Sequence, residues 1–141
     1  MTRDEIMALV GRRNAGWAAR DPQALAATHT VDGTVISPTG GVLKGRSEIE
    51  RVYRIWLTAF PDIVWHPQEI VIDHDRVAVV AKLVGTHAGE FFGLPPAGRH
   101  VEVEVALLIT VADGLVATER RIYDFTGLLV QTGVLRAKPV N

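Results

Sequence analysis

The first half of the chain carries hydrophobic residues at the three- and four-residue steps that are typical of amphipathic helices. One stripe predicts a helix that starts at Thr2, and its members are Ile6, Leu9, Val10 and Trp17. A second stripe predicts a helix that stops at Pro61, and its members are Ile49, Val52, Tyr53, Trp56, Leu57 and Phe60. Two pairs have the spacing of capping boxes at the starts of these helices, Thr2 with Glu5 and Ser47 with Glu50. Between them, Asp21-Pro22 predicts the start of a short helix that ends near His29.

After residue 61 the pattern changes to alternation and to long β-branched runs, which predict strands over roughly 62–73, 76–88, 99–112 and 115–125. The segments 73–75 and 113–114 predict hairpin turns, because Asp-Gly suits a two-residue turn. We also expect a brief strand at 34–38, a turn-rich connection at 39–45, a loop at 89–98 and a closing helical turn before Gly133. Helices followed by antiparallel strands predict an α+β fold, in which a curved sheet packed by helices forms a cone with a hollow at its wide end.

The strands are more hydrophobic than a one-sided sheet requires. The runs "RVAVVAKLV" and "VEVEVALLITV" are apolar at most positions, whereas a sheet with one solvated face alternates more cleanly. A homodimer packed sheet to sheet would cover the excess.

The Asp113-Gly114 turn fixes a register for the last two strands, provided that no bulge interrupts it. Residue 112 then pairs with residue 115, and Asp124 lies opposite Val103. On this register one face of the sheet, which we expect to line the hollow, carries Val103, Val105, Leu107, Arg120, Ile122 and Asp124.

Asp124 is the one acid on that expected face, and Arg120 lies too far along the strand for a direct ion pair. An unpaired buried carboxylate is costly as an anion, so we expect the pKa of Asp124 to rise toward the range of a proton-transfer residue. The alternative interpretation is that Asp124 caps the turn at Thr126 or Gly127.

Several other side chains are candidates for the same hollow. Its ligand-binding wall is predicted to include Trp17, Tyr53, Trp56, Trp65, Val103, Val105, Arg120 and Ile122, although aromatic residues at helical spacing also serve as plain core. Arg120 could anchor a carboxylate or enolate oxygen, or extend to solvent at the rim. His87, beside a glycine-rich loop, could bind a substrate oxygen or brace the loop. His87 and His100 do not have a diagnostic metal-ligand spacing, so no metal is expected.

Composition narrows the classes of function. The chain has 141 residues, which predicts a single domain over 1–141, and 48% of them are hydrophobic. Its formal net charge of -1 argues against nucleic-acid binding, and no apolar run is long enough for a membrane span. The first residues mix charged and apolar side chains without a cleavage site, and cysteine is absent, so the expected location is the cytoplasm.

The second half of the chain resembles a known family. The features that carry the resemblance are Gly85-Thr86-His87, Phe92-Gly93-Leu94-Pro95-Pro96, Gly98-Arg99, Asp113-Gly114, Tyr123-Asp124, Leu128-Leu129, Gln131 and Gly133. They look like the SnoaL-like polyketide cyclase, or "ester cyclase", group of the nuclear transport factor 2-like (ketosteroid isomerase-like) superfamily. The resemblance implies a cone-shaped α+β fold and an enzyme without metal or organic cofactor. It also implies that Asp124 is the acid/base of an intramolecular aldol closure. The better-known cyclases are similar to one another in carrying a histidine on the strand before the Asp-Gly turn. Here that strand reads "VEVEVALLITV", which contains no histidine.

Two classes of function follow from these observations. The first is a cofactor-independent enzyme that acts on a small hydrophobic carbonyl compound by proton transfer at carbon, with Asp124 as acid/base and His87 as a donor to the enolate. A related option is epoxide hydrolysis, as in limonene epoxide hydrolase-like members of the superfamily, which use Asp and Arg to activate water. The second class is a dimeric module that binds a hydrophobic ligand without chemistry, because this architecture hosts many functions.

Overall fold

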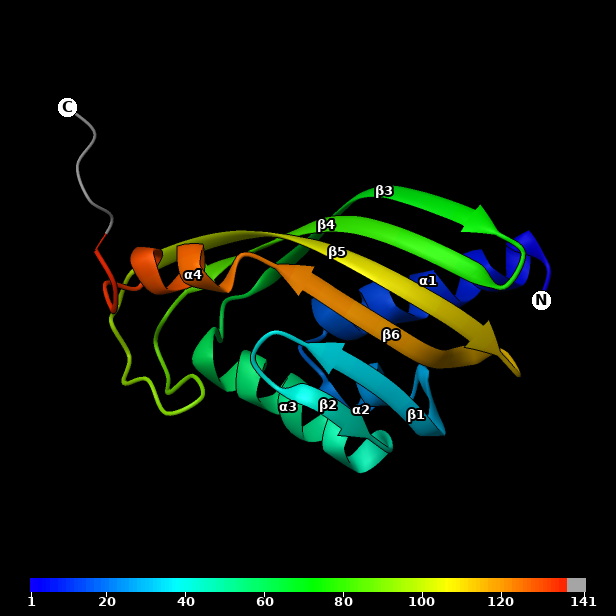
Figure 1. Ribbon diagram of the computed structural model, residues 1–141, viewed down its shortest axis with the longest axis horizontal. Helices are drawn as coiled ribbons and strands as arrows, with labels where there is room; N and C mark the ends of the chain where they lie inside the picture. The colour runs from blue at the N-terminus through cyan, green and yellow to red at the C-terminus, as the bar shows by residue number, and fades with distance from the viewer. Residues whose placement is uncertain (137–141) are drawn as a thin grey trace.

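The computed structural model describes residues 1–136 and has the α+β architecture that the sequence predicts (Figure 1). Three helices, α1 (Arg3–Ala18), α2 (Pro22–Ala26) and α3 (Arg46–Ala59), lie on one side of a curved sheet. A fourth helix, α4 (Phe125–Gln131), follows the last strand at the end of the molecule opposite the N-terminus. None of the helices within 1–136 is long and apolar enough to cross a membrane.

The helix starts follow local capping rules, with one exception. The Thr2 hydroxyl accepts a hydrogen bond from the Glu5 N–H, and the Glu5 carboxylate accepts one from the Thr2 N–H, so the predicted capping box is confirmed. Asp21 caps α2 in the predicted way. The box predicted at Ser47 is wrong, because α3 begins after Gly45, whose φ of 89° turns the chain without a side-chain cap.

The sheet has six strands in the order β2-β1-β6-β5-β4-β3. Their bounds are β1 (His29–Ser37), β2 (Gly41–Lys44), β3 (Val64–Asp73), β4 (Arg76–Thr86), β5 (His100–Ala112) and β6 (Leu115–Tyr123). β1 pairs parallel with β6, and all other neighbours are antiparallel. The four long strands match the predicted ranges to within a few residues. The expected connection at 39–45 instead contains β2, and His29 begins a strand rather than ending a helix.

A β-bulge changes the register of β5 and β6. The two pairs nearest the Asp-Gly turn, Ala112 with Leu115 and Val111 with Val116, follow the predicted register. Ala117 then has no partner, and from Thr110 onward the pairing shifts by one residue, so Leu107 lies opposite Arg121 rather than Arg120. Because side chains alternate between faces, a one-residue shift reverses every side chain of β6 beyond the bulge.

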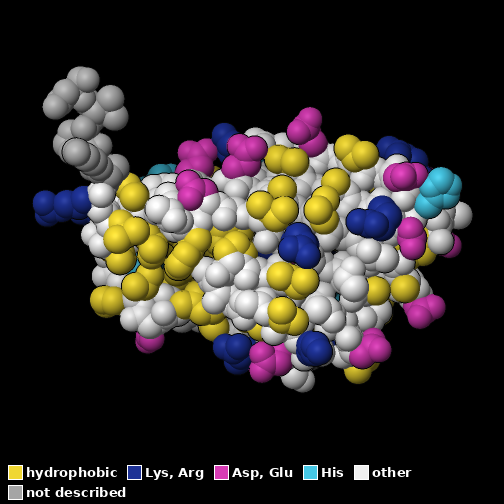
Figure 2. All heavy atoms as spheres, in the orientation of Figure 1, with side chains coloured by type: hydrophobic (Ala, Val, Ile, Leu, Met, Phe, Trp, Pro, Cys, Tyr) yellow, Lys and Arg dark blue, Asp and Glu magenta, His cyan; other side chains and the backbone are white. Residues whose placement is uncertain are grey.

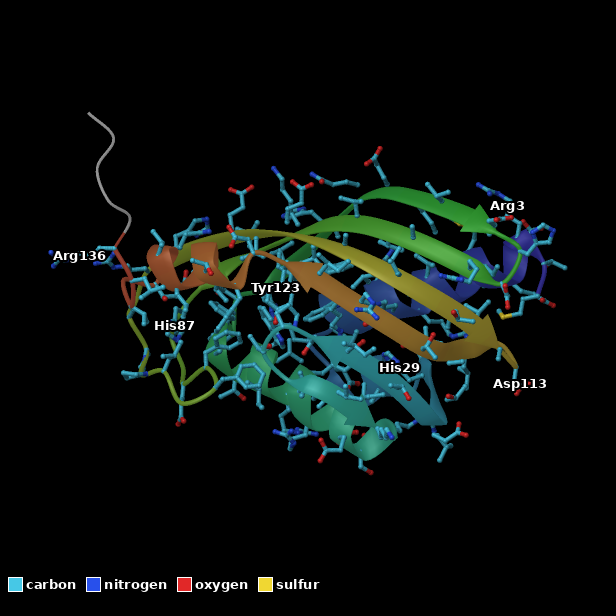
Figure 3. All side chains as sticks on the ribbon, in the orientation of Figure 1. Arg3, His29, His87, Asp113, Tyr123 and Arg136 are labelled. Carbon is cyan, nitrogen blue, oxygen red and sulfur yellow. The ribbon has the colours of Figure 1, made fainter. Side chains whose placement is uncertain are left out.

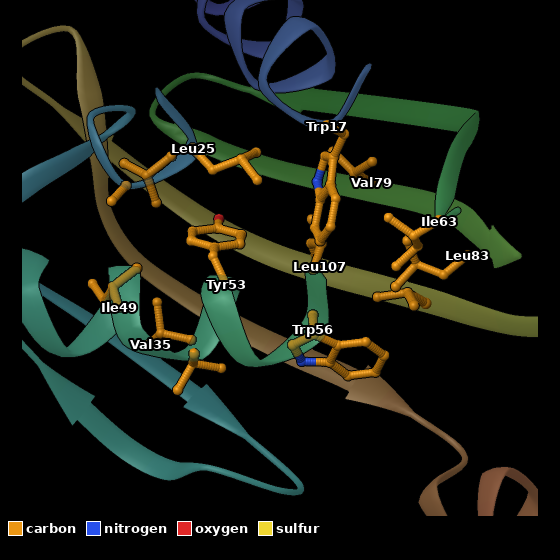
Figure 4. Close-up of a cluster of buried hydrophobic side chains, with 14 of the residues drawn as sticks. Trp17, Leu25, Val35, Ile49, Tyr53, Trp56, Ile63, Val79, Leu83 and Leu107 are labelled. Atoms are coloured by element: carbon orange, nitrogen blue, oxygen red, sulfur yellow. The ribbon is translucent and has the colours of Figure 1, made fainter. Parts of the chain in front are cut away.

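The core lies between the helices and the inner face of the sheet. Trp17 of α1 and Tyr53 and Trp56 of α3 face the strands, where Leu107 and Val79 meet them (Figure 4). Among residues 1–136, no helix covers the outer face of the sheet, which mixes apolar and charged side chains (Figure 2). Leu108 and Ile122 on this face are 43% and 49% exposed. The fold therefore separates an interior that can hold a site from an exterior sheet face that is free to meet a partner.

Candidate functional site

A buried charged cluster lies on the inner face of β6. Arg13, from the middle of the apolar stripe of α1, makes a bidentate ion pair with Glu119: its Nη1 donates to Oε1, and its Nη2 donates to Oε2 at 2.9 Å. Arg121, two residues along the same strand, donates its Nε–H to Oε2 of Glu119 at 2.6 Å. Glu119 is 1% exposed, Arg13 5% and Arg121 8%. The three side chains form an Arg–Glu–Arg cluster with two positive charges and one negative charge.

Burial and charge act in opposite directions on the carboxyl group of this cluster. Burial alone would raise the pKa of Glu119, but the adjacent charges of Arg13 and Arg121 outweigh it and hold that pKa well below its usual range. Glu119 is therefore a carboxylate at any ordinary pH and a weak base. Its charge leaves one of the two guanidinium charges without a neutralising partner in the cluster.

Tyr53 joins the charged cluster to His29. The Tyr53 ring lies under the Arg121 guanidinium, 4.7 Å from ring centroid to Cζ, which is a cation–π distance. Its hydroxyl is 2.8 Å from Nε2 of His29. Burial lowers the pKa of His29 to about 3, so its imidazole is neutral at physiological pH. Burial likewise raises the pKa of Tyr53, which remains a phenol.

The charged cluster borders a cavity with aromatic walls. The cavity measures about 20 Å³, space for about one water molecule. It is lined by Arg13, Trp17, Trp56, Trp65, Leu83, Val105, Leu107, Arg121 and Tyr123. A second, almost wholly apolar cavity of about 20 Å³ shares Arg13, Trp65 and Leu107 with it. The interior is thus narrower than the hollow that the sequence predicts, and a larger ligand has to move some of these walls.

Three hydrogen-bond donors of residues that line the cavity lack acceptors, whereas the Trp65 indole N–H and the Tyr123 hydroxyl have partners. Nε of Arg13, Nε1 of Trp17 and Nη2 of Arg121 are buried, and none of them has a partner in the structure. The Tyr123 hydroxyl lies 2.6 Å from the Thr39 hydroxyl. Burial raises the pKa of Tyr123, with the Thr39 hydrogen bond and Arg121 acting in the opposite sense, so Tyr123 is also a phenol. Such an environment favours a ligand that supplies oxygen acceptors.

The structure places three of the predicted site residues at the surface rather than in the interior. Arg120, Ile122 and Asp124 are exposed, and the interior position predicted for them is wrong because the bulge at Ala117 reverses β6. Asp124 is the N-cap of α4, and its carboxylate accepts the Gly127 N–H at 2.8 Å. The cap, which was the alternative interpretation, is the contact that the structure contains.

His87 is buried at the α4 end of the interior and braces the loop that follows it (Figure 3). Its Nδ1 accepts a hydrogen bond from the Ala97 N–H at 3.3 Å. Its backbone N–H and C=O pair with Arg99 and Gly98. Its ring lies beside Phe60 and Phe91, and its Nε2 has no partner. The loop-bracing alternative fits these contacts, since His87 does not line the cavity of Arg121.

The predicted aromatic wall residues are brought together. Trp17 stacks on Trp65 with ring centroids 5.6 Å apart, and Trp65 donates its indole N–H to Asn14 Oδ1 at 3.0 Å. Trp56 contacts Tyr123 edge to face at 5.5 Å. Val103 and Val105 point inward as predicted, although only Val105 lines the same cavity as Arg121. Tyr53 lies behind Arg121 rather than on the cavity wall.

Sequence reasoning missed Arg13, Glu119, Arg121 and Tyr123 as interior residues. Arg13 had a readable signal, because it falls on the apolar stripe of the first helix, four residues after Leu9 and four before Trp17. The three β6 residues had none, since their direction depends on the bulge. Within residues 1–136 no group of three or more acidic or histidine side chains is placed to hold a metal ion.

Comparison with known proteins identifies the family. The model of the SnoaL-like polyketide cyclase family matches residues 8–132, whereas no curated protein matches the chain. A candidate SnoaL-like polyketide cyclase from Jannaschia sp. CCS1 is similar at 26% identity, with a TM-score of 0.84 over 96% of this chain and 94% of that one. AclR, a candidate hydroxylase from Streptomyces galilaeus, has 27% identity and a TM-score of 0.84 over 98% and 87%.

IdmH, a candidate polyketide cyclase from Streptomyces antibioticus, is a third similar structure, with 26% identity and a TM-score of 0.75 over 90% of this chain and 97% of that one. More distant structures with the ketosteroid isomerase-like or nuclear transport factor 2-like fold share the same architecture at 17–20% identity. The fold class predicted from the resemblance is therefore confirmed. Since the family model covers most of the chain, the chain belongs to the SnoaL-like polyketide cyclase family.

Proposed function

We propose that this chain is an enzyme that acts on a small hydrophobic carbonyl compound by proton transfer at carbon, in an aldol-type cyclisation or an isomerisation. The observation that carries the proposal is the unpaired Nη2 of Arg121 on an aromatic-walled cavity. When a carbon next to a carbonyl loses its proton, negative charge develops on the carbonyl oxygen. A fixed cationic donor in a site with little water stabilises that charge strongly. Membership of the family supports the same class of reaction.

Arg121 takes the role that the sequence assigned to Arg120, and Tyr123 is its partner in the proposal. The Tyr123 hydroxyl is the one group among the residues lining the cavity that can both donate and accept a hydrogen bond. Because its pKa is raised, it is suited to donate a hydrogen bond to the enolate oxygen. The Thr39 hydroxyl, at 2.6 Å, fixes its direction. None of these steps calls for a metal or an organic cofactor, and we propose that the reaction needs neither.

There are two candidates for the group that accepts the proton from carbon. Asp124 is the one that the family resemblance implies, and it directly follows Tyr123 at the end of β6. Its carboxylate is exposed and bonded to the Gly127 N–H, so it would have to leave this cap to reach a substrate. The other alternative is solvent at the Tyr123–Thr39 pair. Glu119 is excluded as a strong base because two guanidinium groups bind it.

Hydrogen–deuterium exchange at carbon tests the proposal without knowledge of the natural substrate. We expect the protein to accelerate exchange of the α-protons of 2-tetralone in neutral D₂O, followed by NMR. Replacing Arg121 by Gln should lower the catalysed rate roughly 100-fold, the scale of losing one donor to an oxyanion. Arg120→Gln, on the outer face, should leave the rate unchanged. If aromatic ketones of one to three rings, both neutral and carboxylate-bearing, all exchange at the buffer rate, the enzyme proposal is wrong.

A binding module without chemistry is the second candidate, and the small cavity and the absence of a free base on its walls favour it. Epoxide hydrolysis has less support, because Asp124 and Arg120 both lie outside the cavity. Ligand binding without any exchange activity would favour the module. Exchange that depends on Arg121 would favour the enzyme.

We also propose a homodimer through the outer face of the sheet. Strand pairing places Glu102, Glu104 and Lys82 toward one end of this face, where Lys82 pairs with Glu102 at 3.2 Å and Asp124 directly follows β6, so this end keeps a net negative charge. Arg76 and Arg120 lie toward the other end, and the centre is apolar, with Val80, Ala106, Leu108 and Ile122. A two-fold axis through the centre would bring the acidic end of one copy to the basic end of the other. Ile122→Glu should therefore convert a dimer into a monomer in size-exclusion chromatography with light scattering. A wild-type chain that runs as a monomer would contradict the proposal.

A further inference from the structure

The cavity beside Glu119 contains three buried nitrogen donors that bind nothing. Nε of Arg13, Nε1 of Trp17 and Nη2 of Arg121 lack acceptors, although their residues are only 5%, 5% and 8% exposed. Buried polar groups in folded proteins nearly always have a partner. All three residues line the same cavity. Three missing acceptors on one cavity indicate that something other than the protein supplies them.

The charge of the site indicates which kind of acceptor fits. Two guanidinium groups and one carboxylate give the buried cluster one excess positive charge. The nearest other titratable groups do not compensate for it, because His29 is neutral and Tyr53 and Tyr123 are phenols. An uncompensated charge away from water is costly, and a bound anion removes that cost. A neutral oxygen acceptor would satisfy the donors but would leave the charge.

The walls indicate what the rest of the ligand is made of. Besides the donors, the cavity presents the faces and edges of Trp56, Trp65 and Tyr123 together with Leu83, Val105 and Leu107. The present space of about 20 Å³ holds about one oxygen atom, and the three donor nitrogens are themselves buried, so a ligand reaches them only when the wall moves. Trp65 and Tyr123 are half-buried, so they form the part of the wall that can move aside for an aromatic or aliphatic body.

We propose that the cavity selects anions: its ligand places a carboxylate, or an equally ionised oxygen, against Arg121, Trp17 and Arg13, and lays an apolar body against the aromatic walls. The inference rests on the proposed function for the location of the site, and it names the substrate class as an anionic carbonyl compound. The neighbour of known structure that binds trimethylamine is only 20% identical, and the charge of the present site is opposite to what such an amine requires.

Matched small ligands test the inference directly. Benzoate, benzamide and phenyltrimethylammonium have similar aromatic bodies and differ in charge. The three tryptophans of the chain all line this cavity, so their intrinsic fluorescence reports binding. We expect benzoate to bind at least about tenfold more tightly than benzamide, the scale of a charge-assisted hydrogen bond. We expect no measurable binding of phenyltrimethylammonium.

Two variants connect the preference to the named donors. Arg121→Gln should weaken benzoate binding about tenfold or more in calorimetry, while Arg120→Gln, one residue away on the outer face, should not change it. Because Arg121→Gln also removes a bond to Glu119, its fold is checked by circular dichroism. Trp17→Phe removes the N–H donor together with the five-membered ring, and it should weaken benzoate several-fold, with the fold again checked by circular dichroism.

Several results would overturn the inference: no saturable benzoate binding in the millimolar range, equal affinity for benzoate and benzamide, or equal effects of the Arg120 and Arg121 substitutions. These results do not depend on turnover. Anion binding without exchange activity would leave this inference intact and contradict the proposed enzyme. Exchange of neutral ketones together with equal affinity for benzoate and benzamide would support the proposed enzyme and contradict this inference.

Discussion

Arg120 and Arg121 are adjacent in sequence and lie on opposite faces of the sheet. Arg121 is bonded to Glu119 and stacked over Tyr53, whereas Arg120 is exposed. A guanidinium inside a site with aromatic walls can act on a ligand, whereas one on the outer face can meet only solvent or a partner. The function proposed here depends on which of the two faces inward.

Asp124 provides the sharpest contrast between the family resemblance and the structure. Its carboxylate bonds the Gly127 N–H at the start of α4, and a Cβ on Gly127 would approach Asp124 Oδ2 to 2.3 Å, so the cap is tightly built. Replacing Asp124 by Ala should lower the free energy of unfolding by about 1 kcal/mol, the usual cost of a lost N-cap. Urea denaturation followed by circular dichroism measures it.

The same variant separates the two candidate proton acceptors. If solvent at Tyr123 accepts the carbon proton, Asp124→Asn should keep most of the exchange activity, because asparagine still caps a helix. Near-complete loss of activity in a stable, folded Asp124→Asn variant would restore Asp124 as the acid/base.

At the scale of elements, the bulge in β6 decides the content of the site. One extra residue, Ala117, brings Glu119, Arg121 and Tyr123 to the inner face. The apolar pattern of β5 predicts most of its buried residues, because valine, leucine and isoleucine alternate there with glutamate, alanine and threonine, and Leu108, which is exposed, is the exception. Apolar and polar residues alternate less clearly in β6, because the adjacent Arg120 and Arg121 place one charged residue on each face. The direction of β6 is therefore set by the bulge and by the partners of Glu119, which lie far away in sequence.

The loop between β4 and β5 depends on a close backbone approach at Gly89. Its N–H bonds the Ala59 carbonyl at the end of α3, and an added Cβ would lie 2.2 Å from the Thr58 carbonyl oxygen. Gly89→Ala should therefore destabilise the protein by about 1–3 kcal/mol in chemical denaturation, because backbone has to move.

The matched control for this substitution is Gly11→Ala in α1. No atom lies within 4 Å of a Cβ at Gly11, and alanine is the better helix former, so this change should be neutral or slightly stabilising. Equal stability of the Gly89→Ala variant and the wild type would mean that the loop does not dock on α3 in solution.

At the scale of the whole molecule, the free energy of unfolding depends on pH, because the core holds an ion cluster and a neutral histidine. His29 has a pKa of about 3 in the folded protein, and a histidine in an unfolded chain has one near 6.5. Between these values only the unfolded chain binds the proton, so stability falls as the pH drops below about 6.5. Glu119 adds to the loss below about 4.5, because its folded pKa is depressed and its ionised form contributes to stability.

His29→Gln should therefore flatten the acid side of the stability profile. Between pH 6.5 and 5 the wild type should lose up to about 1.4 kcal/mol per pH unit more than the variant, the contribution of one proton. Identical slopes for the wild type and the His29 variant would contradict a buried neutral His29.

The fold could be predicted from the sequence and much of the site could not. The helical stripes, the Asp-Gly turn and the alternation in β5 are local signals, and they led to the right class and most element bounds. β2 was missed because its four residues lie among glycines, and the parallel contact of β1 with β6 has no local signal. The interior aromatic residues were predicted from helical spacing. The Arg–Glu–Arg cluster requires knowledge of which face β6 presents, and a single bulge sets that face.

The register of β6 is the claim on which the rest of the account depends, and thiol accessibility tests it most directly. The chain contains no cysteine, so single cysteines at residues 122 and 123 report their own exposure without background. In dilute protein, below the concentration at which a dimer forms through the outer face, Ile122→Cys should react rapidly with a maleimide and Tyr123→Cys at least about tenfold more slowly, limited by local opening. A protected Cys at position 122 together with a reactive one at position 123 would contradict the bulge and place Arg121 outside the cavity.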